Sequence, residues 1–206
     1  MKKFLVIFLA LCLLAFSSCA EKTPGENTEE KITYGENVNT KDDLASFLDG
    51  EKTFIDSETG KESTIYTLHE DNPEYMGRVF RYAAVDLDGD GSDEYLFECD
   101  IGGETAVLHK EGDSWKSYRL HIRERFGIKT DGEMHVLGNA DHEALQRVEF
   151  SDGEMKRVFT LESDYGLGVH KNSSDEISAD EAEKMWESFN KKQNVEWTEM
   201  YPAFEF

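Results

Sequence analysis

The sequence predicts a mainly β fold of the α+β class: an antiparallel meandering sheet, propeller-blade-like or an open barrel, with one helix near each end. Short runs rich in β-branched and aromatic residues fill the middle of the 206-residue chain, and turn dipeptides separate them. A helix-capping pattern stands near each end of this β-rich part. The spacing between runs leaves no room for crossover helices, which favours antiparallel pairing.

The N-terminal residues 1–18 are predicted to be a lipoprotein signal peptide. Two lysines precede an apolar stretch, residues 4–16. This stretch is shorter than the roughly 20 residues that a membrane-spanning helix needs. The sequence FSSC at 16–19 resembles a bacterial lipobox, which predicts a diacylglyceryl group on Cys19. Ordinary cleavage after Ala20 is the alternative, because the preceding residues also fit a small-x-small site.

Residues 19–40 are predicted to be a flexible tether, and residues 41–206 a single domain. The tether is polar and contains almost nothing to bury. Loss of the signal removes two lysines, so the net charge changes from −22 to −24. A surface this acidic disfavours nucleic acid and anionic lipid headgroups, and favours cations or basic partners. We therefore expect no nucleic-acid partner.

Cysteine usage argues against an intramolecular disulfide. The chain has three cysteines; Cys12 leaves with the signal and Cys19 is expected to carry lipid, so Cys99 alone remains. Cys99 lies in an apolar, strand-like run, which favours a buried structural thiol. The alternative is a nucleophile, which needs a base that the fold brings to it.

The first predicted helix begins at Thr40, a hydroxyl cap followed by acidic residues, and ends at Gly50. Leu44 and Phe47 share one of its faces. The second helix begins at the capping box Ser178 to Glu181. Its stripe of apolar residues is typical of core packing and consists of Ala182, Met185, Trp186 and Phe189.

Between the helices, seven runs are predicted to be strands. They span residues 78–85, 95–99, 105–109, 114–122, 134–137, 144–150 and 155–161. The clearest hairpin is at Asp152-Gly153, because this dipeptide suits a tight turn that needs positive φ.

An acidic stretch, VDLDGDGSDEYLF at 85–97, joins the first two of these strands. Asp86, Asp88 and Asp90 have the D-x-D-x-D-G spacing of calcium loops, and Gly91 allows the sharp turn. An EF-hand has its bidentate Glu at the twelfth loop position, which is Phe97 here, and its flanks are helical. The EF-hand interpretation is therefore rejected.

A shorter loop fits, with Glu94 at the ninth position as the closing carboxylate and Ser92 supplying a backbone carbonyl. Oxygen ligands of this kind suit a hard cation. The sequence thus predicts a structural Ca²⁺ site, and Asp93 is out of phase with it. The alternative is an acidic surface turn without an ion. The predicted ligands are Asp86, Asp88, Asp90, Ser92 and Glu94.

The stretch 82–97 resembles the calcium β-loops of FG-GAP and VCBS repeats, which occur in several copies in integrin-type propellers, whereas this chain has one. The signal, the single DLDGDG loop and the segments AVLHKEGDSW, RLHIRERFGIKTDGEM and NVEWTEM resemble small uncharacterised cell-surface lipoproteins of Firmicutes. The resemblance implies a surface lipoprotein and brings no catalytic residues.

No catalytic residues are predicted from the sequence. The six histidines are scattered without metal-ligand spacing, and G-x-S-x-G, P-loop and G-x-G-x-x-G motifs are missing from the sequence. Asp141, His142 and Glu143 have the residue types of a catalytic cluster, but the side chains of sequence neighbours often point in different directions. Carboxylate pairs for glycosidase chemistry remain open, because 44 acidic residues supply many candidates.

The sequence as a whole predicts an extracytoplasmic lipoprotein on the outer face of the bacterial cell membrane. Its partners are expected to be the membrane, through the lipid anchor, and a protein or glycan ligand. The alternative is a hydrolase acting on envelope or host polymers. A shallow aromatic patch, with Trp115 or Tyr118, would favour binding. A cleft lined by carboxylates or containing a His-Asp pair would favour the enzyme.

Overall fold

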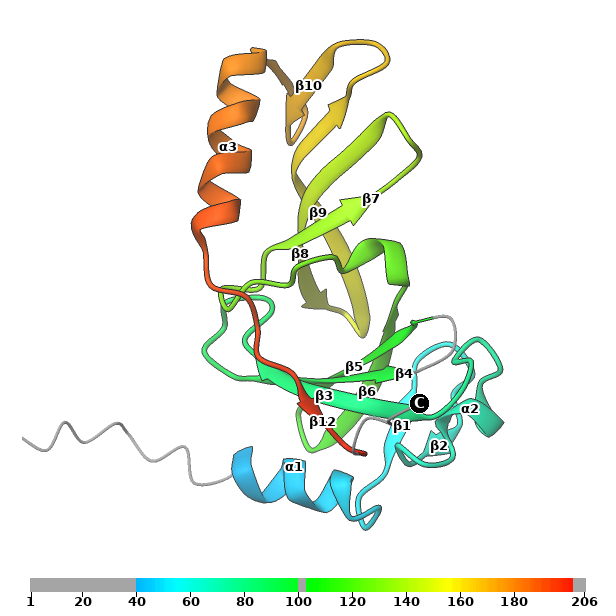
Figure 1. Cartoon of the computed structure of the whole chain (residues 1–206). Coiled ribbons are helices and arrows are strands. Elements are labelled where there is room, and N and C mark those ends of the chain that lie inside the picture. The colour runs from blue at the N-terminus through cyan, green and yellow to red at the C-terminus, as the bar shows by residue number, and fades with distance from the viewer. Residues whose placement is uncertain (1–39, 100–102, 202–206) are drawn as a thin grey trace, which may run out of the picture. The chain divides into compact units, whose positions relative to one another are not determined.

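The computed structural model describes residues 40–99 and 103–201, all within one compact unit that spans Asn37–Phe206. These residues form a mainly β structure with two sheets and a few helices, which confirms the predicted fold class (Figure 1). The predicted signal peptide, Cys19 and almost all of the tether lie outside the described residues.

The helices are α1 (Thr40–Leu48), α2 (Leu68–Asp71), the 3₁₀ helix η1 (Ile122–Glu124) and α3 (Ala179–Lys191). Helix α3 begins with the predicted capping box, in which Ser178 and Glu181 each bond the backbone N–H of the other. No helix in the described part of the chain has both the length and the apolar character needed to cross a bilayer.

The larger sheet has seven strands in the order β12-β3-β4-β5-β6-β1-β2. The strands β3 to β6 form an antiparallel meander, as predicted. Strand β1 instead pairs parallel to β6, with Ile55 opposite Lys116, so the expectation of a purely antiparallel sheet is wrong here. A long connection between the two strands allows this, whereas a hairpin would not. The bounds are β1 (Phe54–Asp56), β2 (Glu62–Ser63), β3 (Val79–Val85), β4 (Glu94–Cys99), β5 (Thr105–Glu111), β6 (Ser114–Leu120) and β12 (Thr198–Glu199).

The smaller sheet has five strands in the order β11-β10-β9-β8-β7, all antiparallel. Asp152 and Gly153 have φ of 56° and 78°, which makes the predicted tight hairpin between β8 and β9. Both sheets are open in the described residues. The bounds are β7 (Met134–Leu137), β8 (His142–Ser151), β9 (Glu154–Asp164), β10 (Val169–Asn172) and β11 (Asp175–Ile177).

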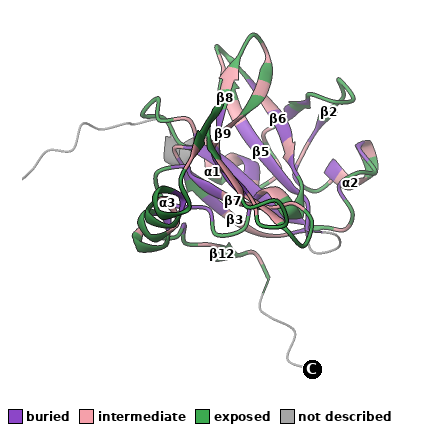
Figure 2. Cartoon of the chain, turned by 90° about the horizontal axis from the view of Figure 1, so that it is seen from above, coloured by how far each residue is buried: buried purple, intermediate pink, exposed green. Residues whose placement is uncertain are grey.

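The meander is covered on both faces. On one face, Phe47 of α1 packs edge-on against Trp115, with ring centroids 5.3 Å apart, in an aromatic cluster. On the other face, Leu96 packs in a second cluster that includes Val148 of β8. All six residues of β4 are therefore buried, among them Cys99, whose predicted burial is confirmed. Figure 2 shows the buried residues concentrated in the strands of this sheet.

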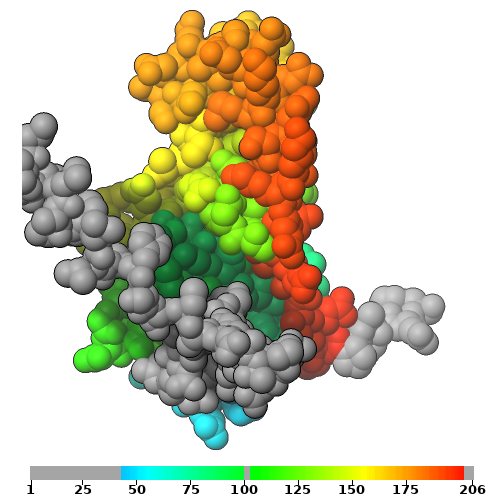
Figure 3. Space-filling view, turned by 90° about the vertical axis from the view of Figure 1, so that its left-hand side faces the viewer, coloured from blue at the N-terminus to red at the C-terminus, as the bar shows by residue number. Residues whose placement is uncertain are grey.

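Helix α3 covers one face of the smaller sheet. Ala182 and Phe189 are buried against Leu145 and Leu161, and Trp186 packs beside them, which confirms the predicted packing stripe. The segment after α3 then continues to β12 at the edge of the larger sheet. Figure 3 shows it as a continuous orange-to-red band along one side of the unit.

Candidate metal centre

The acidic loop connects β3 to β4, where Val85 and Glu94 are the last paired residues. Leu87 is completely buried in the core and anchors the loop, and Asp86 and Asp88 on either side of it are half-buried. Gly91 has a φ of 89°, a conformation that side-chain-bearing residues rarely adopt. Gly91 thus permits the tight turn that returns the chain from β3 to β4.

Three carboxylates meet in this loop. Oxygen atoms of Asp86, Asp88 and Glu94 all lie within 4.8 Å of one another. Two oxygens on opposite sides of a calcium ion, each about 2.4 Å from it, are about 4.8 Å apart. The cluster therefore has the dimensions to hold one ion.

The cluster of three carboxylates does not include Asp90, and Ser92 is predicted to offer a backbone carbonyl and not a carboxylate. Asp90 is exposed, and its Oδ1 accepts a hydrogen bond from the backbone N–H of Ser92 at 2.7 Å. This bond holds the Asp90 side chain in the turn, and Ser92 is itself exposed. Asp93 is exposed as well, in agreement with its position out of phase. The three clustered carboxylates are all predicted ligands, and the role of the Ser92 carbonyl stays a prediction.

Backbone hydrogen bonds hold the two aspartates in place. Asp86 accepts from the N–H groups of Gly89 and Gly91, at 2.7 and 3.0 Å. Asp88 accepts from the N–H of Asp90 at 3.1 Å. A carboxylate oxygen has two lone pairs, so each one that accepts one such bond can still bind a cation.

Glu94 is the buried member of the cluster, with 1% of its surface exposed. Its Oε2 accepts from the backbone N–H of Leu87 at 2.8 Å, and its Oε1 lies 2.9 Å from Nδ1 of His109. Burial raises the pKa of Glu94, and the charge of Asp88 adds to this, although the two hydrogen bonds act in the opposite direction. The site therefore holds a carboxylate whose charge is costly without a nearby cation.

His109 is the residue that sequence reasoning missed. It lies in β5, beside Glu94 because Tyr95 pairs with Leu108, and its ring stacks on Phe150 of β8 at 3.9 Å. Burial alone would lower the pKa of His109, but the hydrogen bond and charge of Glu94 outweigh it, so the pKa is raised. A carboxylate only accepts hydrogen bonds, so Nδ1–H of His109 donates and fixes the orientation of Glu94.

The pKa values of half-buried Asp88 and exposed Asp93 are also raised. Burial raises the pKa of Asp88, and Asp90 and Asp86 add to it through their charge. The pKa of Asp93 is raised by burial and by the charge of Asp86. A cation bound among these groups would offset the repulsion that raises their pKa values.

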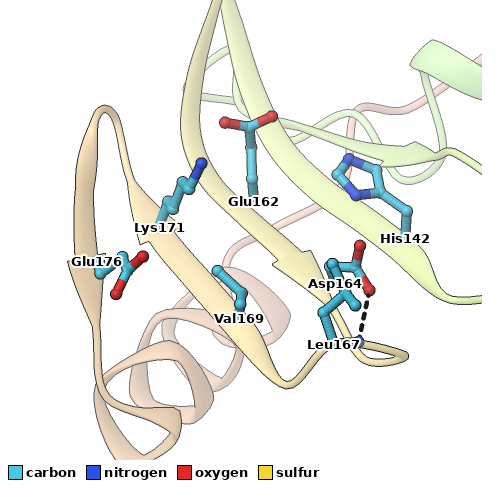
Figure 4. A pocket seen from close by; sticks show the side chains of 7 residues that line it. All are labelled: His142, Glu162, Asp164, Leu167, Val169, Lys171 and Glu176. Carbon is cyan, nitrogen blue, oxygen red and sulfur yellow. Dashed lines mark hydrogen bonds between the residues drawn. The ribbon is translucent and has the colours of Figure 1, made fainter.

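A second candidate site lies on the face of the smaller sheet that α3 leaves uncovered. It is a pocket of about 340 Å³. Lys171 pairs across the strands with Glu162 on one side and with Glu176 on the other, and His142 pairs with Asp164. Figure 4 shows their side chains around the pocket, with the hydrogen bond from the N–H of Leu167 to Asp164. This is a carboxylate-lined surface with a His-Asp pair in register.

Trp115 and Tyr118 do not form the shallow aromatic patch that would favour ligand binding. Trp115 and Tyr118 have 6% and 4% of their surfaces exposed, because both pack inside the core clusters. Trp115 stacks on Tyr95 with ring centroids 5.1 Å apart. Tyr118 also lines one surface pocket, but its side chain offers almost no exposed area there.

Comparisons with known proteins return no matching family model, no matching curated protein and no matching solved structure. The resemblance to calcium β-loops and to surface lipoproteins therefore stays a prediction from the sequence. The functional argument rests on the geometry of this chain.

Proposed function

We propose that the protein is a membrane-anchored extracytoplasmic lipoprotein whose domain is stabilised by one calcium ion and binds a protein or glycan ligand at the cell surface. The observation that supports the calcium site is the burial of Glu94 within 4.8 Å of the oxygens of Asp86 and Asp88. Anchoring is supported by the signal and lipobox at residues 1–19, and by the polar segment after them.

The donor set favours calcium over other common metals. All three clustered groups are carboxylates, which prefer hard cations, and the ring nitrogen of His109 that faces them is already bonded to Glu94. Calcium takes six to eight oxygens in flexible geometry, so exposed backbone carbonyls such as that of Ser92, together with water, can complete the shell. Magnesium demands a nearer octahedral arrangement and keeps more of its water.

The position of the loop links ion binding to folding. Asp86 and Asp88 follow β3, whereas Glu94 begins β4, so their oxygens are neighbours only when the two strands pair. An ion that binds the folded state alone stabilises it by about 2.7 kcal/mol when its concentration is 100 times the dissociation constant. Binding in the range of about 10⁻⁴ to 10⁻³ M is common among extracellular calcium modules.

A thermal melt of the domain tests the calcium site. Excess calcium is expected to raise the midpoint of the wild type by about 5 to 10 °C over that in chelator, if calcium reaches about 100 times the dissociation constant. Asp88→Asn should abolish this shift, because it removes a clustered carboxylate charge and keeps the size of the side chain. Asp93→Asn should retain the shift, because Asp93 is outside the cluster.

Glu183→Gln is the matched control for net charge. It removes one exposed carboxylate from α3 and should leave the calcium-dependent shift unchanged. Equal melting midpoints of the wild type in calcium and in chelator would reduce the stretch to an acidic surface turn.

A hydrolase acting on envelope or host polymers is the second candidate. The pocket with Glu162, Asp164 and His142 supports it, because paired carboxylates and a His-Asp pair are typical of hydrolytic chemistry. If this proposal holds, the wild type cleaves a polysaccharide or peptide polymer of the envelope and Asp164→Asn does not. A wild type without such cleavage across both polymer classes would reject it.

A further inference from the structure

A further pocket lies beside the larger sheet, between η1 with the segment that follows it and the segment that precedes β12. Its volume is about 390 Å³. Small-molecule pockets commonly range from about 300 to 1,000 Å³. Two arginines, Arg81 and Arg125, and one carboxylate, that of Glu98, contribute its charged wall. The apolar wall consists of Ile122, Phe126, Ile128, Val195 and Trp197.

The two guanidinium groups share a single carboxylate oxygen. Nε and Nη2 of Arg81 donate to Oε2 of Glu98 at 2.9 and 2.6 Å, and Nη1 of Arg125 donates to the same oxygen at 2.8 Å. Arg125 also donates to the carbonyl of Gly103 through its other nitrogens. Within the described residues, Glu98 is the only carboxylate paired with either arginine.

Among the described residues that line the pocket, the two guanidinium groups and the single carboxylate leave a surplus of one positive charge. This is unusual in a chain with a net charge of −22. The pKa of Arg125 is lowered, first by burial and also by the like charge of Arg81, although Glu98 and Glu104 oppose this. A second anion near the pair would offset the repulsion between the guanidinium groups.

Arg81 lines the pocket and keeps a donor group that no described acceptor uses. Its side chain is 31% exposed, and among the described residues no acceptor bonds its Nη1. The guanidinium lies 4.6 Å from the centroid of the Trp197 ring and 5.2 Å from that of Phe80. This packing orients the planar group, which lowers the entropy cost of binding a planar carboxylate.

The apolar wall continues to the surface. Ile122 and Phe126 are 44% and 41% exposed, which is high for large apolar side chains. They line the same pocket as Arg81. An apolar surface next to a single surplus cation matches a ligand with one negative charge and an apolar body.

We propose that this pocket binds a monocarboxylate with a compact aromatic or branched apolar body. The carboxylate accepts hydrogen bonds from Arg81, and the body packs against Trp197 and Ile122. A phosphate monoester fits less well, because its charge of about −1.5 to −2 exceeds the single surplus charge. The chemistry is the same for a free acid and for the C-terminal carboxylate of a peptide that ends in Phe. This inference goes beyond the proposed calcium site and does not depend on it.

The test is a titration with 3-phenylpropionate, followed by the amide NMR signals of Ile122, Phe126 and Trp197. Saturable shifts are expected, with a dissociation constant on the order of 10⁻⁴ to 10⁻³ M for so small a ligand. 3-Phenylpropanamide, which lacks the charge, should bind about tenfold more weakly or worse. A tripeptide ending in Phe, compared with its C-terminal amide, shows whether a peptide can be the source of the carboxylate.

Two variants assign the effect to the pocket. Arg81→Gln should weaken binding about tenfold, while Arg147→Gln, which removes an arginine paired with Asp131 elsewhere, should leave it unchanged. Ile122→Asp changes an exposed position, so the fold is expected to persist, and its new carboxylate should repel the ligand. Titrations with calcium and with chelator separate this site from the metal centre.

Several outcomes would overturn the proposal. The first is the absence of saturable shifts in the folded wild type up to about 20 mM acid, which is roughly 20 times the largest dissociation constant expected. The second is equal affinity for the acid and its amide. The third is unchanged binding in a folded Arg81→Gln variant. If the acids bind but the peptide carboxylate does not, the ligand is a free acid.

Discussion

His135 of β7 is packed against aromatic side chains of α3. Its ring centroid lies 4.9 Å from that of Trp186 and 6.3 Å from that of Phe189, and its Nε2 is 3.5 Å from a carboxylate oxygen of Glu143. Burial lowers the pKa of His135, and the nearby Glu143 compensates only in part. The folded protein therefore favours the neutral imidazole.

The first prediction is an acid-sensitive contribution to stability. The unfolded chain, in which His has a pKa of about 6.5, binds the proton more readily than the folded state. The contribution of His135 is therefore present above about pH 6.5 and is lost as the pH falls toward the lower pKa of the folded state. His135→Phe should reduce the loss of stability between about pH 7 and pH 5, measured by urea unfolding.

His69→Gln in α2 controls for the loss of an imidazole outside this aromatic cluster. If the His135→Phe variant loses as much stability on acidification as the wild type, the burial of a neutral histidine is not the cause.

At the candidate metal centre, the sequence predicted some of the residues and missed another. Spacing alone predicted that Asp86, Asp88 and Glu94 share one site, because the loop is local in sequence. It could not identify His109, which is 15 residues from Glu94 and is placed by the pairing of β4 with β5. It also placed Asp90 among the ligands, whereas this carboxylate lies outside the cluster of three and accepts a hydrogen bond from the backbone N–H of Ser92 in an exposed turn.

At the scale of elements, helix α3 depends on its first turn. Ser178 Oγ accepts from the N–H of Glu181, and the Glu181 carboxylate accepts from the N–H of Ser178 at 3.0 Å. These bonds satisfy donors that a helix N-terminus otherwise leaves without partners.

Ser178→Ala should destabilise the domain by about 1 kcal/mol, because it removes a capping side chain. Ser174→Ala, at an exposed turn before β11, is the matched control and should change the free energy of unfolding by less than about 0.5 kcal/mol. Urea denaturation measures both. Equal effects of the two substitutions would show that the capping box contributes nothing to α3.

The longer elements were predictable and the short ones were not. The central strands and both predicted helices have enough apolar periodicity to identify them. Strands β2 and β12 have two residues each, too few for a pattern, and they exist because the edges of β1 and β3 offer hydrogen-bonding partners. The parallel pairing of β1 with β6 likewise depends on a contact between residues about 60 positions apart.

At the scale of the molecule, the acidic loop between β3 and β4 is linked to both sheets. Glu94 begins the fully buried β4 of the larger sheet, and His109, which bonds Glu94, stacks on Phe150 of the smaller sheet. An ion bound at the loop would therefore stabilise the contact between the sheets as well as the β3–β4 connection. This is the physical reason to expect a global effect on the melting temperature from one small site.

The proposed anchor makes a prediction for the whole chain. Cys19 is expected to carry a diacylglyceryl group, so Cys19→Ala should move the protein from the membrane fraction to the soluble fraction. Detergent partitioning and the intact mass of the wild type measure this. Cys99→Ala is the control, because that cysteine is buried in β4 and should not affect partitioning. A wild type without the lipid mass would instead indicate ordinary signal cleavage.

The most direct test of the metal centre is equilibrium dialysis of the folded domain against calcium. We expect one calcium ion per chain, and binding should be lost in Glu94→Gln and Asp88→Asn, provided that circular dichroism shows both variants to be folded. Glu183→Gln should bind as the wild type does. A folded wild type that takes up no calcium at millimolar free ion, or variants that bind as tightly as the wild type, would contradict the proposed role of the β3–β4 loop.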